Sequence, residues 1–152
     1  MQPRITYPRL REIFPALPDA LTTLKQRILD TGLEAGLLHL LELRASQING
    51  CGFCMELHSR EARQDGERQQ RLDVLPAWRD LPDWFDAKER AALDWCETLT
   101  RLTGPRVTDQ QFAALQQHFT EQQIAALTAA VVMINGWNRV VWALQFEPRK
   151  IV

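Results

Sequence analysis

The chain has 152 residues and a formal net charge of −1, with 18 Lys and Arg residues against 19 Asp and Glu residues. This balance, with the basic residues scattered along the chain, argues against binding to nucleic acid or to an anionic membrane surface. Hydrophobic residues make up 45% of the chain and charged residues 24%, which is typical of a soluble globular protein. We therefore expect a single domain that covers residues 1–152.

Neither a targeting signal nor a membrane span is visible in the sequence. The first residues, MQPRITYPRLREIF, lack the apolar core of a secretory signal. The longest apolar stretch, AALTAAVVMI, is about half the length that crosses a bilayer. These features predict a cytoplasmic protein. In a reducing cytosol, a cysteine pair is more often catalytic or metal-binding than structural.

Helical spacing of apolar residues recurs along nearly the whole chain, and no stretch alternates as a strand does. The segment 72–87, which contains LPAWRDLPDWF, predicts a connector with short turns. Thr108 and Thr120 each begin a capping box. The pattern predicts helices over residues 17–30, 34–48, 51–65, 87–102, 108–119 and 120–146. The predicted fold class is all-α, a bundle of about six to eight helices.

The last predicted helix, 120–146, carries apolar side chains on nearly all its faces. A helix with this pattern is usually either central to a bundle or located at a subunit interface. The pattern alone favours neither position over the other.

The most informative motif is CGFCMELH, in which Cys51 and Cys54 are followed by His58. On a helix these three side chains share one face. The break at Asn49 and Gly50 places Cys51 near the first turn, where unpaired backbone N–H groups favour a thiolate. Once one thiol has attacked or been oxidised, the other can close a disulfide, and the histidine can take and return the proton.

Two other interpretations of this motif stay open. A structural zinc site needs four ligands, whereas Cys51, Cys54 and His58 supply three, so His39 or His118 would have to complete it. Alternatively, the two cysteines are inert core residues. The glycines and the histidine beside the pair do not resemble core filling, so a redox dithiol is favoured. The third cysteine of the chain, at position 96, is predicted to be a small core residue.

The segment LRASQINGCGFCMELHSREAR resembles the cysteine–histidine motif of the alkylhydroperoxidase D-like branch of the carboxymuconolactone decarboxylase superfamily. The flanking segments TGLEAGLLHLLELRASQINGC, FDAKERAALDWCETLT and VTDQQFAALQQHFTEQQIAALTAAVVMINGWNRV are similar to that family as well. Roughly residues 5–147 are covered by the resemblance.

This resemblance implies an all-helical subunit that assembles into a homo-oligomer, a trimer or hexamer, with thiol-dependent peroxidase and disulfide-reductase activity. Cys54 matches the thiol that attacks the peroxide. Cys51 matches the partner that closes the disulfide and meets the reductant, and His58 matches the proton-transfer histidine. No metal or organic cofactor is implied. The implied partners are a peroxide substrate and a dithiol reductant, either lipoyl-bearing or thioredoxin-like.

The sequence departs from the family pattern at one position. The family has a relay glutamate twelve residues before the first cysteine, and His39 occupies that position here. An imidazole can also relay protons. Alternatively, Glu42, one turn later on the same predicted helix, supplies the carboxylate. Both residues are therefore candidate relay members.

Two further functions remain as alternatives. A lactone decarboxylase of the same superfamily is one, although that chemistry does not need a dithiol. A metal-binding or purely structural module is the other, for which one tightly held zinc per chain and unreactive thiols would be the signature.

Overall fold

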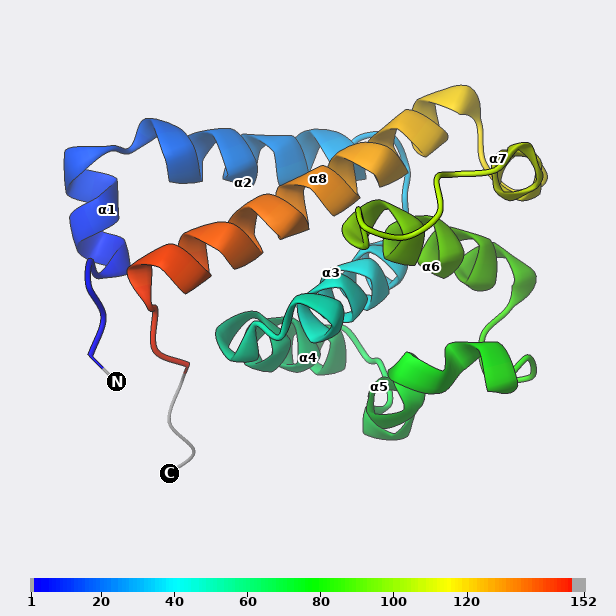
Figure 1. The fold of residues 1–152 in the computed structure, drawn as a ribbon, viewed down its shortest axis with the longest axis horizontal. Coiled ribbons are helices and arrows are strands. Elements are labelled where there is room, and N and C mark those ends of the chain that lie inside the picture. The colour runs from blue at the N-terminus through cyan, green and yellow to red at the C-terminus, as the bar shows by residue number, and fades with distance from the viewer. Residues whose placement is uncertain (1, 149–152) are drawn as a thin grey trace.

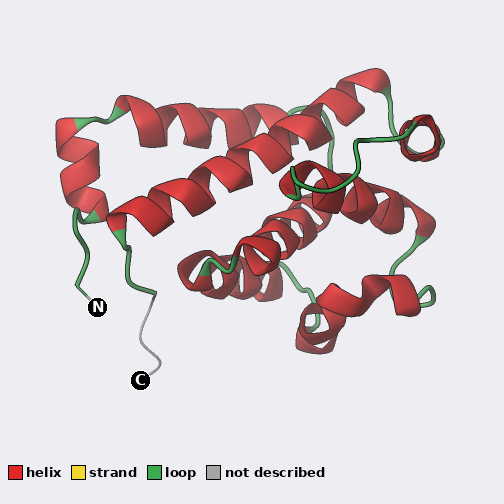
Figure 2. Ribbon diagram, in the orientation of Figure 1, coloured by secondary structure: helices red, strands yellow, loops and turns green. Residues whose placement is uncertain are grey.

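The computed structural model describes residues 2–148, which form helices and loops with no strand (Figure 2). The all-α prediction is confirmed, and the eight α-helices among the described residues lie at the upper end of the expected number. The helices are α1 (Tyr7–Ile13), α2 (Ala16–Leu29), α3 (Ala35–Asn49), α4 (Gly52–Gln64), α5 (Gln69–Val74), the 3₁₀ helix η1 (Leu75–Asp80), α6 (Ala87–Thr100), α7 (Asp109–Gln116) and α8 (Glu121–Leu144).

Two short α-helices and the 3₁₀ helix were not expected from the sequence. Helix α1 has seven residues, α5 has six and η1 has six, the last two overlapping the segment predicted as a connector. Elements this short hold fewer than two full turns, so apolar periodicity cannot reveal them. Pro76 lies in the first turn of η1, where its missing N–H leaves no hydrogen bond unmade.

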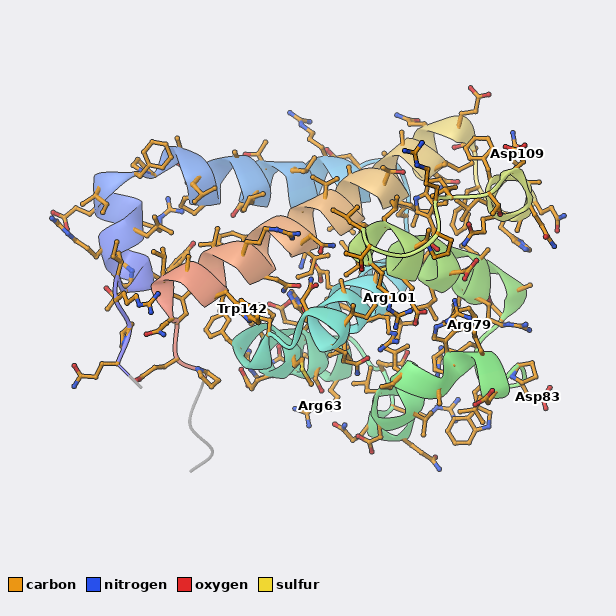
Figure 3. All side chains as sticks on the ribbon, in the orientation of Figure 1. Arg63, Arg79, Asp83, Arg101, Asp109 and Trp142 are labelled. Atoms are coloured by element: carbon orange, nitrogen blue, oxygen red, sulfur yellow. A yellow bond between two sulfur atoms is a disulfide. The ribbon has the colours of Figure 1, made fainter. Side chains whose placement is uncertain are left out.

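Helix α3 is the centre of the bundle. It packs against α4, α6 and α8, and every residue from Leu37 to Ser46 is buried. Helix α8 runs beside α2 (Figure 1) and contributes one buried face to the same core. Its other face exposes Val132 and Trp142, the latter 67% exposed and labelled in Figure 3. Helix α8 is therefore less enclosed than α3, although it is the more apolar of the two.

The length and hydropathy of Glu121–Leu144 match those of a membrane span, and no other described helix has both. Half of its most apolar stretch is nevertheless buried against the rest of the protein. That is the behaviour of a core helix in a soluble fold.

A sharp corner between α3 and α4 positions the cysteine motif. Gly50 ends α3 in the left-handed conformation, with φ of 67°, which a residue without Cβ adopts at no steric cost. The N–H of Cys51 then donates to the carbonyl of Ser46 at 3.0 Å and closes the end of α3. Cys51 thereby becomes the N-cap of α4, and the chain reverses within two residues.

The two ends of the described chain meet at one end of the molecule (Figure 1). The N–H of Arg4 donates to the carbonyl of Leu144 at 2.9 Å. Tyr7 of α1 packs edge-to-face against Phe146, which follows α8, with 6.0 Å between ring centroids. These contacts place α1 and the segment after α8 side by side.

A buried carboxylate joins α3, η1 and α6. Glu97 accepts hydrogen bonds from Arg44 at 2.6 Å, from the indole N–H of Trp78 at 3.0 Å and from Arg101 at 2.9 Å. Arg79 also bonds to it, and both Arg79 and Arg101 are labelled in Figure 3. Burial raises the pKa of Glu97, but these donors outweigh it and lower the pKa to about 2. The cluster stabilises the side of the bundle that carries η1.

The capping box at the start of α8 gives a first prediction. The N–H of Gln123 donates to the Thr120 hydroxyl at 3.2 Å, and the Gln123 side chain accepts from the N–H of Thr120. Thr120→Ala is expected to lower the free energy of unfolding by about 1 kcal/mol, because the N–H of Gln123 loses its acceptor, the Thr120 hydroxyl. Urea denaturation measures this change. Thr103→Ala, at an exposed loop position, is the control, and an equal loss in both variants would contradict the capping role.

Candidate active site

The two cysteines of the motif form a disulfide at the start of α4. Their Cα atoms lie 5.3 Å apart, and each residue is only 2% exposed. The Sγ atom of Cys51 also accepts the N–H of Cys54 at 3.3 Å. The pair therefore occupies the helix N-terminus that the sequence predicted. Cys96, predicted to be a core residue, is buried in α6, where burial raises its pKa to about 12.

Cys54 and His58 line a cavity of about 370 Å³ between α1, α2, α3, α4 and α8. Its polar side holds these two residues together with Thr22, Lys25, Glu42 and Glu61, and its remaining wall is apolar. The apolar lining consists of Tyr7, Phe53, Leu57, Trp137, Val141 and Phe146. Cys51 lies in a small apolar cluster with Cys54 and Val141, against which two of these aromatic rings pack.

His58 lies between two carboxylates. Its Nδ1 atom is 3.2 Å from Oε2 of Glu42 and 3.4 Å from Oε2 of Glu61. Burial of the ring lowers the pKa of His58, but the contacts with the two carboxylates outweigh burial and leave the pKa above its ordinary value. The arrangement thus favours an imidazolium next to the cysteine pair.

Glu42 is the carboxylate closest to His58, and it is 1% exposed. Its Oε1 atom lies 3.0 Å from Nζ of Lys25. Burial raises the pKa of Glu42, whereas His39, His58 and the positive charge of Lys25 lower it by more, so the pKa lies well below its ordinary value. Of the two relay candidates on α3, Glu42 is therefore the one beside His58.

His39 contacts Glu42 rather than His58. Its Nε2 atom is 2.8 Å from Oδ2 of Asp65, and its Nδ1 atom is 3.6 Å from Oε2 of Glu42. The contact with Glu42 raises the pKa of His39, burial opposes it, and the bond to Asp65 adds to the rise. The structure therefore brings both candidate residues into one cluster, in which Glu42 lies between His39 and His58.

Three residues of this cluster were not predicted from the sequence: Lys25, Glu61 and Asp65. Glu61 carried a local signal, since it follows His58 by three residues on the same helix and so lies on the same face. Asp65 carried a similar signal, since it follows His58 by seven residues, about two helical turns, at the end of the helix predicted over 51–65. Lys25 lies on α2, so no spacing rule within one helix could have found it.

Among the residues that the structure describes, one group of side chains could hold a metal ion. It consists of His39, Glu42 and Glu61, whose ligand atoms lie within 4.8 Å of one another. The ammonium of Lys25 already lies 3.0 Å from Glu42 and 3.7 Å from Glu61. A bound cation would have to displace that ammonium. The residues therefore fit an internal ion-pair network better than a metal site.

The fold and the site now define the class of the protein. A family model described as the carboxymuconolactone decarboxylase family matches residues 15–98, more than half of the chain. The chain belongs to this family, and its fold is that of the alkylhydroperoxidase D-like proteins within it. The matched segment runs from the start of α2 into α6 and includes the cysteine motif.

Individual relatives support this assignment. The chain is 38% identical over 101 residues to the uncharacterized protein YdfG of Bacillus subtilis, a match that covers 66% of this chain and 68% of the relative. A crystal structure from Agrobacterium tumefaciens superposes with a TM-score of 0.88 and 32% identity, covering 99% of this chain and all of that one. That protein is of unknown function, and the description antioxidant defence protein AhpD has been suggested for it.

A more distant structure with the same fold belongs to a protein that is named for a different activity. The debrominase Bmp8 superposes with a TM-score of 0.76 at 18% identity, over 89% of this chain and 72% of that chain. At this level of identity the similarity concerns the fold alone. Family membership therefore does not fix the reaction, which has to be argued from the site.

Proposed function

We propose that the chain is a thiol-dependent peroxidase and disulfide reductase with an antioxidant role. The observation that carries the proposal is the disulfide between Cys51 and Cys54 at a helix N-terminus, next to a buried histidine paired with a carboxylate. This combination provides a dithiol that cycles between two redox states and a group that moves its protons. The cavity that Cys54 and His58 line has room for a small peroxide.

The first step is attack of the Cys54 thiolate on the peroxide. The S–O bond forms as the O–O bond breaks, so the sulfur is oxidised to a sulfenic acid and the alkoxide leaves. His58 protonates this alkoxide to an alcohol. Since Glu42 and Glu61 hold Nδ1 of His58, Nε2 is the nitrogen left to give that proton.

The second step closes the disulfide. Cys51 gives its proton to His58 and its sulfur attacks the sulfenic sulfur of Cys54. The S–S bond forms, the S–O bond breaks, and the hydroxide takes the proton back as water. An external dithiol then reduces the disulfide by thiol–disulfide exchange and becomes a disulfide itself. One peroxide and one dithiol thus yield one alcohol, one water and one oxidised dithiol.

The partners follow from this chemistry. The substrate is a peroxide, and the reductant is a lipoyl-bearing or thioredoxin-like dithiol, in keeping with a cytoplasmic location. We further propose a homo-oligomer, a trimer or hexamer, in which the exposed apolar side chains of α8, Val132 and Trp142, are covered. Sedimentation of the purified protein measures the subunit number.

The two alternative functions differ from this proposal in what they require of the cysteine pair. Lactone decarboxylation gives no role to a dithiol. Metal binding through Cys51, Cys54 and His58 requires two free thiolates, whereas here the sulfurs are bonded to each other.

Oxidation of the reduced protein by peroxide tests the proposal directly. One equivalent of an organic hydroperoxide is expected to remove both motif thiols from alkylation and to lower the protein mass by two hydrogens, because the disulfide closes. A lipoamide dithiol should restore both thiols and sustain peroxide consumption. Zinc content is measured on the same sample. Thiols that stay reduced under peroxide, or a tightly held zinc with unreactive thiols, would overturn the proposal.

A further inference from the structure

A second hollow lies next to the candidate active site, on the far side of Lys25 and Glu61, which line both. Its volume is about 240 Å³, and it is bounded by α2, α3 and the end of α4. His39 and Asp65 line this hollow but not the cavity that holds Cys54. Asp65, whose side chain is 55% exposed, connects it to solvent.

Four side chains connect the second hollow to the cysteine cavity. Asp65 Oδ2 lies 2.8 Å from Nε2 of His39, and Nδ1 of the same ring lies 3.6 Å from Oε2 of Glu42. That same Oε2 lies 3.2 Å from Nδ1 of His58. Both imidazole rings therefore present Nδ1 to one carboxylate oxygen. In each ring, Nε2 is the nitrogen that does not face Glu42.

Three buried atoms of the cluster have no hydrogen bond of good geometry: Nδ1 of His39, Nδ1 of His58 and Oε2 of Glu61. Buried polar atoms without a partner are rare in folded proteins and call for an explanation such as a catalytic role. Here two of the three are ring nitrogens within 3.2 and 3.6 Å of the same carboxylate oxygen. A small rotation of the His39 ring brings the longer contact to hydrogen-bond length.

We propose that Asp65 and His39 form the outer end of a proton path that runs through Glu42 to His58 and opens into the second hollow. The inference rests on the proposed function and adds two residues to it. A proton enters His39 at Nε2 and leaves at Nδ1, crosses Oε2 of Glu42, and enters His58 at Nδ1. It then leaves His58 at Nε2 toward the sulfurs.

The reaction needs such a path in its reductive half. The attacking dithiol arrives as a thiolate that has left its proton in solvent, and Cys51 departs as a thiolate. The second thiol of the dithiol supplies the proton of Cys51, whereas His58 gave its own proton to the alkoxide, so one proton must come from solvent to restore the imidazolium of His58. Most of the lining of the cysteine cavity is apolar, and under the proposed function the reductant occupies this cavity at that moment. An entry through the second hollow stays open meanwhile.

The groups that face His39 determine how the path responds to pH. Glu42 contacts it from α3, Asp65 from the end of α4, and Lys25 from α2 acts on it by charge. Glu61 of α4 also faces it, with an oxygen within 4.8 Å. Glu42 and Asp65 favour the imidazolium and Lys25 disfavours it, with a net rise of the His39 pKa. Asp65→Asn removes one of the two favourable contacts. In this variant, the imidazolium of His39 is then expected to lose its proton at a lower pH than in the wild type.

Rapid-mixing measurements of disulfide reduction by a lipoamide dithiol test the path in the intact protein. Asp65→Asn is expected to slow this step about five- to tenfold at pH 8 and to leave it near the wild-type rate at pH 6, where solvent protons are abundant. Gln64→Ala, which alters the same hollow at an exposed residue, is the control and should match the wild type. An equal rate in Asp65→Asn and wild type at pH 8 would overturn the path.

Chemical rescue separates proton transfer from a structural role. His39→Ala is expected to be slow at pH 8 and to recover with added imidazole but not with 1-methylimidazole, which has similar size but only one nitrogen that can carry a proton, so it cannot pass a proton from one side of the ring to the other. Rescue by both compounds, or by neither in a folded variant, would overturn the path. A wild-type protein that consumes no peroxide with the dithiol would instead overturn the proposed function itself.

Discussion

Cys54→Ser is expected to lower dithiol-driven peroxide consumption by at least about 10³-fold, close to complete loss. A serine hydroxyl is not ionised near neutral pH and is a far weaker nucleophile toward peroxide than a thiolate. The cavity itself should persist, since the substitution replaces one buried small side chain by another. Initial rates of hydroperoxide consumption, together with a circular dichroism check of folding, measure the effect.

Two further variants sharpen this result. Cys51→Ser should complete one oxidation of Cys54 to the sulfenic acid, which a sulfenic-acid reagent traps, and then stop because no disulfide can close. Cys96→Ser is the matched control, because Cys96 is buried in α6, does not line the cavity of Cys54, and donates to the backbone carbonyl of Leu41 at 3.5 Å. Steady turnover in Cys54→Ser, or a loss in Cys96→Ser as large as in Cys54→Ser, would rule out the assigned nucleophile.

The second large effect is expected for Glu42→Gln, with a fall in kcat/KM of about 10²-fold. The amide keeps the shape of the side chain but leaves the imidazolium of His58 and the ammonium of Lys25 without their buried counter-charge. Removing one partner of a buried charged pair costs about 3 kcal/mol of stability. Urea denaturation should show that loss alongside the kinetic one.

The pH dependence of kcat/KM tests whether Glu42 sets the protonation of His58. In the wild type the pKa of His58 is raised, so its protonated form persists to higher pH than for a free imidazole. Glu42→Gln removes the larger of the two carboxylate contacts, so the decline of kcat/KM with rising pH should move to lower pH. The depressed pKa of Glu42 itself contributes stability above the ordinary carboxyl range, and that stability is lost as the pH falls.

Glu56→Gln is the control for this prediction. Glu56 also pairs with a cation, Arg60, at 3.0 Å, but on the partly exposed surface of α4. Its loss should change stability by less than about 1 kcal/mol and leave the pH profile in place. If Glu42→Gln keeps the wild-type profile, the carboxylate does not set the protonation of His58.

The sequence predicted the long helices well for local reasons. Helices α7 and α8 begin at the threonine capping boxes, and α3 ends at Gly50, because caps are short-range features that the chain itself encodes. Helices α1 and α5 escaped because their stability comes from packing on neighbours rather than from periodicity. The degree of burial of α3 also escaped, since it depends on three other helices.

The residues of the candidate site also divide into those that local spacing predicts and those whose contacts depend on helix packing. Cys51, Cys54 and His58 were found because spacings of three and four residues place them on one face of a helix. Their predicted roles, and the relay roles of His39 and Glu42, stay predictions for the experiments above. Lys25 comes from α2, and Asp65 ends the motif helix but contacts His39 of α3, so both contacts depend on how helices pack. The domain prediction, residues 1–152, likewise stays a prediction.

The meeting of α1 with the segment after α8 has a practical consequence for all these assays. Tyr7 and Phe146 both line the cavity of Cys54, and each lies close to an end of the chain. An extension joined close to either of these two residues therefore lies beside the cavity and can hinder access by a bulky reductant. Protein without such an extension, or with a label placed instead at the exposed loop around Gly104, keeps the cavity accessible.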